Sequence, residues 1–273
     1  MHVIFTGVGE AFDETLGNTS LLVLFETEGV KRQVLLDCGF TAAHAFWRES
    51  PEPLKLDAVW ISHFHGDHFF GLPLLLLRFW EEGRKRPLVI IGQNGIENKV
   101  TAVLDLAYPR FRPKLGFEIE FLEVTPGKDR QLLDLRWSFA ENGHSSPCLA
   151  LRLDQDQGSL FYSGDGGPTD ATRTLAAECD LIVHEAFGID ELQTGHGSVN
   201  LSIDFALGRK AKALALVHMN RNVRRSSAAE VRQTLARLAP LKALLPEPGD
   251  HKQSFLVGAF RRDASARREN RDL

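Results

Sequence analysis

The sequence places four metal-binding side chains within six residues, His63-Phe64-His65-Gly66-Asp67-His68. They follow an apolar, strand-like run over residues 57–62. Imidazoles and a carboxylate this close together would repel and desolvate one another in a core, whereas divalent transition metals bind this ligand mixture well. The alternative, a surface loop that happens to be rich in histidine, is less favoured because matching ligands follow later in the chain. The segment predicts an active-site turn at the end of a strand.

The spacing of these side chains predicts two metal positions. His63 and His65 lie two residues apart on backbone leaving a strand, so their side chains can point to one side. Asp67 and His68 follow the tight turn at Gly66 and can point to a second position. An apolar run from residue 72 to 80 then predicts a buried helix that supports the loop from behind, with proline tolerated in its first turn.

The loop has the form HxHxDH, and the chain resembles the metallo-β-lactamase-fold hydrolases. The resemblance begins at residues 6–9 and 18–20, continues through Leu35-Leu36-Asp37-Cys38-Gly39 and the HFHGDH loop, and resumes downstream. It implies two groups of metal ligands that share one bridging carboxylate: His63, His65 and His144 for one metal, Asp67, His68 and His218 for the other, and Asp165 between them. Two divalent ions are therefore implied, with Zn²⁺ expected and Mn²⁺ or iron as alternatives.

Each downstream ligand also has an ordinary structural interpretation. His144 could be a turn histidine, Asp165 could cap its glycine-rich turn, and His218 could be a satisfied core histidine after an apolar run. Their joint order behind an intact HxHxDH loop favours the metal-binding interpretation.

Two later segments resemble ribonuclease Z in particular. Residues 179–187 resemble its His-Glu-Ala-Thr segment, and residues 194–198 resemble the Gly-His-Ser-Thr segment that follows. The resemblance implies that Glu185 and His196 form a pair that delivers a proton to the leaving oxygen, while His184 is structural. The alternative is that Glu185 is a helix N-terminal acid and His196 belongs to the N-cap turn of a helix over 199–207.

The resemblance implies a dinuclear metal-dependent phosphodiesterase. A hydroxide bridging the metals would attack phosphorus, Asp67 would act as base, and His196, polarised by Glu185, would protonate the departing alkoxide. An acyl hydrolase of lactones or thioesters at the same metals is the first alternative. A non-catalytic metal-binding or partner-binding protein is less favoured, because such a protein usually lacks a ligand and none is missing here.

Two departures from ribonuclease Z bear on the substrate. That family inserts a long flexible arm between its third histidine and its bridging aspartate, but residues 144–165 leave room for only a hairpin. Its Ser-Arg-Tyr segment is replaced by residues 219–222, where Arg221 could hold a phosphate or be an ordinary surface arginine. The net charge of −4 gives no general attraction to nucleic acid. We expect small phosphodiesters or short single-stranded ends as substrates, and weak, salt-sensitive cleavage of precursor transfer RNA.

Composition is typical of a compact enzyme. Of 273 residues, 43% are hydrophobic and 25% charged, which is enough for one large core. The cysteines Cys38, Cys148 and Cys179 are predicted to be reduced and buried. The chain opens without a signal-like segment, and its longest apolar run, residues 69–77, is too short to span a membrane. We therefore expect a cytoplasmic enzyme without membrane contact, with a homodimer as an open alternative.

The element pattern predicts an α/β (α+β) chain folded as a four-layer αββα sandwich of the metallo-β-lactamase type. Strands are predicted at residues 3–6, 21–26, 33–37, 58–62, 88–91, 118–124, 133–140, 149–153, 159–162, 181–184 and 213–218. Helices are predicted at residues 43–49, 72–82, 96–107, 199–207 and 227–238. One hydrolase domain over residues 1–258 is expected, followed by a charged, frayed tail over 259–273.

Overall fold

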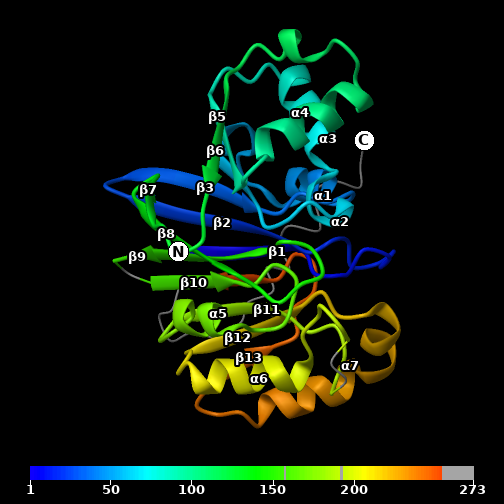
Figure 1. Cartoon of the computed structure of the whole chain (residues 1–273), viewed down its shortest axis with the longest axis vertical. Helices are drawn as coiled ribbons and strands as arrows, with labels where there is room; N and C mark the ends of the chain where they lie inside the picture. The colour runs from blue at the N-terminus through cyan, green and yellow to red at the C-terminus, as the bar shows by residue number, and fades with distance from the viewer. Residues whose placement is uncertain (157, 191–192, 254–273) are drawn as a thin grey trace, which may run out of the picture.

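The computed structural model of the chain describes residues 1–156, 158–190 and 193–253. Within them, two seven-stranded sheets pack face to face, and helices cover the outer face of each sheet (Figure 1). The predicted four-layer αββα sandwich is confirmed. The predicted tail, residues 259–273, lies outside the described residues, so the boundary at residue 258 stays a prediction.

The first sheet has the strand order β14-β1-β2-β3-β4-β5-β6. Its strands are β1 (His2–Gly7), β2 (Ser20–Thr27), β3 (Val30–Leu36), β4 (Ala58–Ile61), β5 (Leu88–Gln93), β6 (Ile119–Val124) and β14 (His251–Gln253). The helices of this half are α1 (Ala42–Glu49), α2 (Gly66–Phe69), α3 (Leu72–Glu81) and α4 (Ile96–Ala107), with short 3₁₀ helices at Pro53–Lys55 and Arg112–Lys114. Strands β3 to β6 run parallel, so the loops that follow them emerge at one edge.

The second sheet has the order β13-β12-β11-β10-β9-β8-β7. Its strands are β7 (Arg130–Leu132), β8 (Leu135–Glu141), β9 (Leu149–Gln155), β10 (Gly158–Tyr162), β11 (Leu181–Glu185), β12 (Ala213–Val217) and β13 (Lys242–Leu244). The helices are α5 (Asp170–Leu175), α6 (Val199–Gly208) and α7 (Arg221–Ala236). Strands β10 to β13 are parallel, so this sheet also presents its strand ends at one edge.

Strand β4 shows why the sequence gives this layering. Ala58 and Trp60 face the core between the sheets, while Val59 and Ile61 face the core beneath the helices. A strand covered on both faces needs a continuous apolar run rather than an alternating one. The Trp60 ring stacks on Phe139 of β8 with centroids 5.2 Å apart, which joins the two sheets.

The elements predicted from periodicity are all present, and α4 has the predicted bounds. The main correction concerns α7, which begins at Arg221 rather than at Ser227. Its start is fixed by Asn220, whose side chain accepts hydrogen bonds from the backbone N–H groups of Asn222 and Val223. The short elements α2, α5, β7, β13 and β14 were not predicted, because none is long enough to show a clear period.

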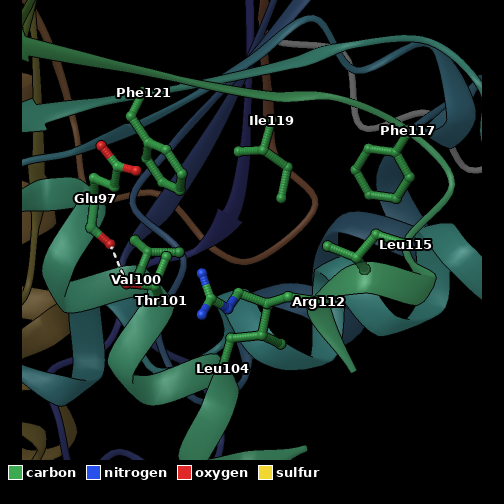
Figure 2. A pocket seen from close by; sticks show the side chains of 9 residues that line it. All are labelled: Glu97, Val100, Thr101, Leu104, Arg112, Leu115, Phe117, Ile119 and Phe121. Atoms are coloured by element: carbon green, nitrogen blue, oxygen red, sulfur yellow. Dashed lines mark hydrogen bonds between the residues drawn. The ribbon is translucent and has the colours of Figure 1, made fainter. Parts of the chain in front are cut away.

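A cavity of about 200 Å³ lies between α4 and β6 (Figure 2). Val100 and Leu104 of α4 face Ile119 and Phe121 of β6 across it. Its lining includes none of the predicted metal ligands.

All three cysteines are free and buried, as expected. Among the described residues, no helix is both long and apolar enough to cross a membrane.

Candidate metal centre

The candidate ligands come from loops at the facing edges of the two sheets. His63 and His65 follow β4, and Asp165 and His218 follow β10 and β12. His144 follows β8. The structure brings these residues together with Asp67 and His68 of α2 into two groups, in each of which the candidate ligand atoms lie within 4.8 Å of one another.

The loop carrying the HxHxDH sequence is hydrogen-bonded to the segment that follows β3. The Cys38 backbone N–H donates to the His68 carbonyl over 2.7 Å, and Gly71 donates back to the Cys38 carbonyl over 2.8 Å. Gly39 allows this approach, because a Cβ there would lie 1.8 Å from the Asp67 carbonyl oxygen. The backbone thus positions the loop independently of its side chains.

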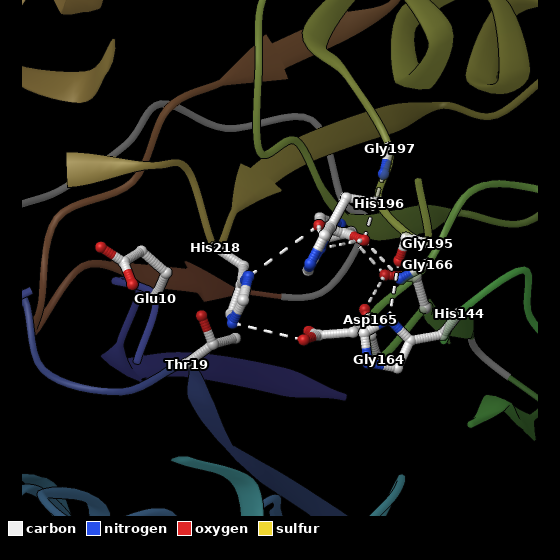
Figure 3. A network of polar contacts seen from close by, with 12 residues as sticks. Glu10, Thr19, His144, Gly164, Asp165, Gly166, Gly195, His196, Gly197 and His218 are labelled. Atoms are coloured by element: carbon white, nitrogen blue, oxygen red, sulfur yellow. Dashed lines mark hydrogen bonds and ion pairs between the residues drawn. The ribbon is translucent and has the colours of Figure 1, made fainter. Parts of the chain in front are cut away.

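The first group contains His63, His65, His144 and Asp165. A ring nitrogen of His65 lies 3.2 Å from Nε2 of His144, and Nε2 of His63 lies 3.8 Å from Asp165 Oδ2. His144 donates through Nδ1 to the Gly195 carbonyl over 2.6 Å, which leaves Nε2 free to bind a metal. Figure 3 shows the His144 side chain beside the loop that contains Gly195.

The second group contains Asp67, His68, Asp165 and His218, and all four are buried. Asp67 Oδ2 lies 3.2 Å from His218 Nε2 and 3.3 Å from His68 Nε2, and His68 Nε2 lies 3.3 Å from Asp165 Oδ1. Four ligands at zinc–nitrogen distances around a tetrahedral ion would be about 3.3–3.4 Å apart. The observed separations therefore fit a bound ion.

Buried polar atoms without partners support the same fit. Among the described residues, His63 Nε2, His68 Nε2 and Asp165 Oδ1 are buried and have no hydrogen-bond partner. Buried polar atoms are normally satisfied, so a cluster of unsatisfied ones that point together needs a further partner. A divalent cation suits this mixture of nitrogen and carboxylate donors.

Asp37 lies directly behind the second group, and no role had been predicted for it beyond its place in the family motif. It is fully buried and accepts hydrogen bonds from His68 Nδ1 over 2.8 Å and from the Tyr162 hydroxyl over 2.6 Å. Ser62 donates to it from both its backbone N–H and its hydroxyl. A carboxylate on Nδ1 fixes the ring orientation and leaves Nε2 facing the metal position.

The two groups differ in their electrostatics. Burial, together with neighbouring imidazoles, holds the pKa of His63 well below its usual value. Burial also opposes protonation of His68, but Asp165 and Asp37 raise its pKa well above the usual value. Against the same opposing effect of burial, Asp165 and Asp67 raise the pKa of His218 to about 9. The carboxylates around the second group therefore favour the protonated form of both histidines, and an incoming metal must compete with protons there.

The predicted Glu185–His196 pair is close in space. Glu185 ends β11, is fully buried, and lies 3.1 Å from His196 Nδ1. The backbone N–H groups of Gly166 and Gly197 also donate to its carboxylate. Burial lowers the pKa of His196, but the hydrogen bond and charge of Glu185 outweigh this and raise it above the usual value.

Glu185 ends β11 and does not open a helix, which contradicts the helix-terminal alternative for it. His196 lies two residues before Ser198, the N-cap of α6, so it is both next to that cap and paired with Glu185. The His196 ring stacks on Phe187 with centroids 4.5 Å apart. Glu185, His196 and His218 form a third close group, with His218 Nδ1 3.9 Å from Glu185.

Arg221 is partly exposed and is paired within the protein, and its predicted contact with a phosphate stays a prediction. It forms an ion pair of 2.8 Å with Glu10, whose side chain is almost completely buried. Its charge is thus already balanced within the protein.

Comparison with known proteins gives the family. Residues 1–237 match the family model described as Anti-Pycsar protein Apyc1. Ribonuclease BN of Erwinia tasmaniensis is 26% identical over 276 residues, which cover 81% of this chain and 89% of the relative. Ribonuclease Z of Bacillus thuringiensis is 26% identical over 272 residues, with the same shares covered.

Solved structures show the same fold. YhfI of Bacillus subtilis, a metallo-β-lactamase-fold protein, superimposes with a TM-score of 0.74 at 19% identity, covering 92% of this chain and 98% of that one. The short form of human tRNase Z gives a TM-score of 0.74 at 22% identity, covering 93% and 99%. The chain therefore belongs to the Anti-Pycsar Apyc1 family and is a metallo-β-lactamase-fold protein related to ribonucleases BN and Z.

Proposed function

We propose that this protein is a metal-dependent phosphodiesterase that acts on small diesters, with nucleoside cyclic phosphates as the first candidates. The observation that carries the proposal is the Glu185–His196 pair, held at 3.1 Å beside two ligand groups that share Asp165. The family description and the relatives called ribonuclease BN and ribonuclease Z support phosphodiester chemistry.

We assign the candidate ligands to two metal ions according to the two groups in which they lie. His63, His65 and His144 would hold one ion, Asp67, His68 and His218 the other, and Asp165 would contact both. When bound, the ions would supply an activated water and neutralise charge on the phosphate oxygens. The donor set favours Zn²⁺, with Mn²⁺ or iron as alternatives.

The protein's own side chains would manage the protons. The Asp67 carboxylate would accept a hydrogen bond from the attacking water and orient it. His196 would donate a proton from Nε2 to the departing oxygen, because its Nδ1 is turned toward Glu185. Glu185 raises the pKa of His196, which favours the protonated form that a general acid requires.

The leaving group of a nucleoside 3′,5′-cyclic phosphate makes this acid necessary. A ribose alkoxide leaves poorly without a proton, whereas p-nitrophenolate leaves easily. We expect His196→Ala to slow cyclic nucleotide hydrolysis by about 10²–10⁴-fold and bis-p-nitrophenyl phosphate hydrolysis far less. The metal content should not change.

The assay uses purified, metal-loaded protein, with His44→Ala as the matched control because His44 is an exposed histidine on α1. A panel of lactones and thioesters tests the acyl-hydrolase alternative. Turnover of that panel without diester hydrolysis would replace the proposal. If His196→Ala slows hydrolysis of both diesters equally, His196 and Glu185 have a structural role instead.

Folded transfer RNA is a less favoured substrate. Between residues 144 and 165, residue 157 aside, the described chain forms only the antiparallel pair β9 and β10. Contacts far from the scissile bond supply binding energy for a large substrate, and this hairpin offers little surface for them. Efficient precursor processing by the purified protein at physiological salt would contradict this expectation.

A further inference from the structure

The loop of residues 10–17 begins beside the candidate metal centre. The backbone N–H of His218 donates to the Val8 carbonyl over 2.9 Å, and Gly9 forms a β-bridge with Met219. The chain that leads into the loop is therefore attached to the segment carrying a candidate ligand.

Ion pairs attach the same loop to the start of α7. Glu10 pairs with Arg221 at 2.8 Å, and Glu14 pairs with Arg225. Arg221 is three residues beyond His218, so their Cα atoms are at most about 11 Å apart. The arginine that pairs with the loop therefore belongs to the segment that directly follows a candidate ligand.

The loop is internally ordered. Asp13 Oδ1 accepts hydrogen bonds from the Thr15 backbone, the Thr15 hydroxyl and the Leu16 backbone, each at 2.9 Å. The Phe12 backbone N–H donates to Glu10 Oε2 over 2.8 Å. The position of Phe12 is consequently set by hydrogen bonds on both sides of it.

Phe12 is nevertheless 74% exposed. The guanidinium carbon of Arg221 lies over its ring, 5.5 Å from the centroid. A single exposed apolar residue is ordinary on a protein surface, and Leu106 at the end of α4 is one, with 84% exposure. Phe12 differs because hydrogen bonds order its loop, a cation lies over its ring, and Gly9 and Glu10 join the loop to the segment that follows His218.

We propose that Phe12 is a specificity-determining residue that stacks against the base of a nucleotide whose phosphodiester lies at the metal centre. The inference rests on the proposed phosphodiesterase function and deepens it. Stacking on an aromatic ring is tolerant of base identity, so the contact selects nucleotides over base-free diesters rather than one base over another.

The experiment compares two substrates with the same scissile bond: a nucleoside 3′,5′-cyclic phosphate and the base-free ribose 3′,5′-cyclic phosphate. Phe12→Ala should lower kcat/KM for the nucleotide by about 5- to 100-fold, mainly through KM, and leave the base-free compound unchanged. Phe12→Trp should retain nucleotide activity. Leu106→Ala, which truncates an exposed apolar side chain elsewhere, should change neither.

Three results would overturn the inference. They are an equal loss on both substrates, no loss on either, and a wild type that does not distinguish them. Loss of a dimer in Phe12→Ala, seen by sedimentation with unchanged kinetics, would instead show that the ring contacts a second copy.

Failure of the proposed function gives a different result. In that case the metal-loaded wild type hydrolyses neither cyclic phosphate. Calorimetry with a nucleoside 5′-monophosphate then decides about Phe12, because weaker binding by Phe12→Ala than by Leu106→Ala upholds the contact and equal binding removes it.

Discussion

The two candidate ligand groups differ in how completely the protein encloses them. In the first, His65 is exposed and His144 is partly exposed, whereas every member of the second is buried. Asp37 supports the second group from behind through His68. The comparison indicates one position that the fold builds rigidly and one that faces the side from which a substrate can enter.

We expect the largest effect from replacing Asp165, because this residue belongs to both groups and its loss should weaken metal binding at both. Wild-type protein supplied with zinc should approach two ions per chain, and Asp165→Ala should lose most of both. Activity should fall by more than the about 10²–10³-fold that loss of a single electrostatic stabiliser causes. Elemental analysis beside kinetics measures this, with the exposed Asp204→Ala as control. Loss of one ion with the other retained would show that Asp165 is not shared.

The next largest effect is on the free energy of unfolding, which should respond differently to a substitution in each group. In metal-free protein, His68→Ala leaves the buried Asp37 without its imidazole partner, so we expect a loss of about 3–5 kcal/mol in the free energy of unfolding. His65→Ala, at an exposed position, should change it by no more than about 0.5 kcal/mol. Denaturant titration in chelator measures both, and similar losses for the two variants would contradict the difference in enclosure.

A smaller effect tests the support behind the second group. Asp37→Asn keeps the side-chain shape and a backbone φ of +60°, which asparagine tolerates. We expect metal affinity to fall by about 10- to 100-fold at one position only. Competition with a chromogenic chelator resolves the two binding steps. Equal weakening of both steps would place Asp37 behind the whole centre rather than one half of it.

The smallest effect concerns pH. The pKa of His196 is raised by Glu185, so the pair's contribution to stability is present below about pH 6.5 and is lost as pH rises through the folded-state pKa. His196 also loses the proton that it would donate as pH rises through this pKa. Glu185→Gln should therefore move the alkaline limb of cyclic nucleotide hydrolysis to lower pH. An unmoved limb would assign that ionisation to another group.

The sequence is most informative where partners are close along the chain. His63 to His68 lie within one turn, and the run ending at Ile61 is apolar enough to be read as a strand. The family motif contains Asp37 but does not reveal its role, because its partner Tyr162 comes from the other sheet. The start of α7 was placed late because the N-cap at Asn220 lies in a polar segment without apolar periodicity.

The same limit applies to the pairing of Arg221 with Glu10, which joins opposite ends of the chain. No local pattern predicts such a contact. Family resemblance, in contrast, predicts that Glu185 and His196 form a pair, although neither lies in a segment whose spacing indicates catalysis, and the structure brings them within 3.1 Å.

The hydrogen bond from Tyr162 to Asp37 gives the protein an internal optical probe. Tyr162 is one of only two tyrosines in the chain. Burial and the neighbouring Asp37 raise the pKa of its phenol well above the usual value, so the ring stays un-ionised while the sheets remain packed. The tyrosinate absorption that develops from Tyr162 at alkaline pH therefore reports separation of the two sheets, without any added label.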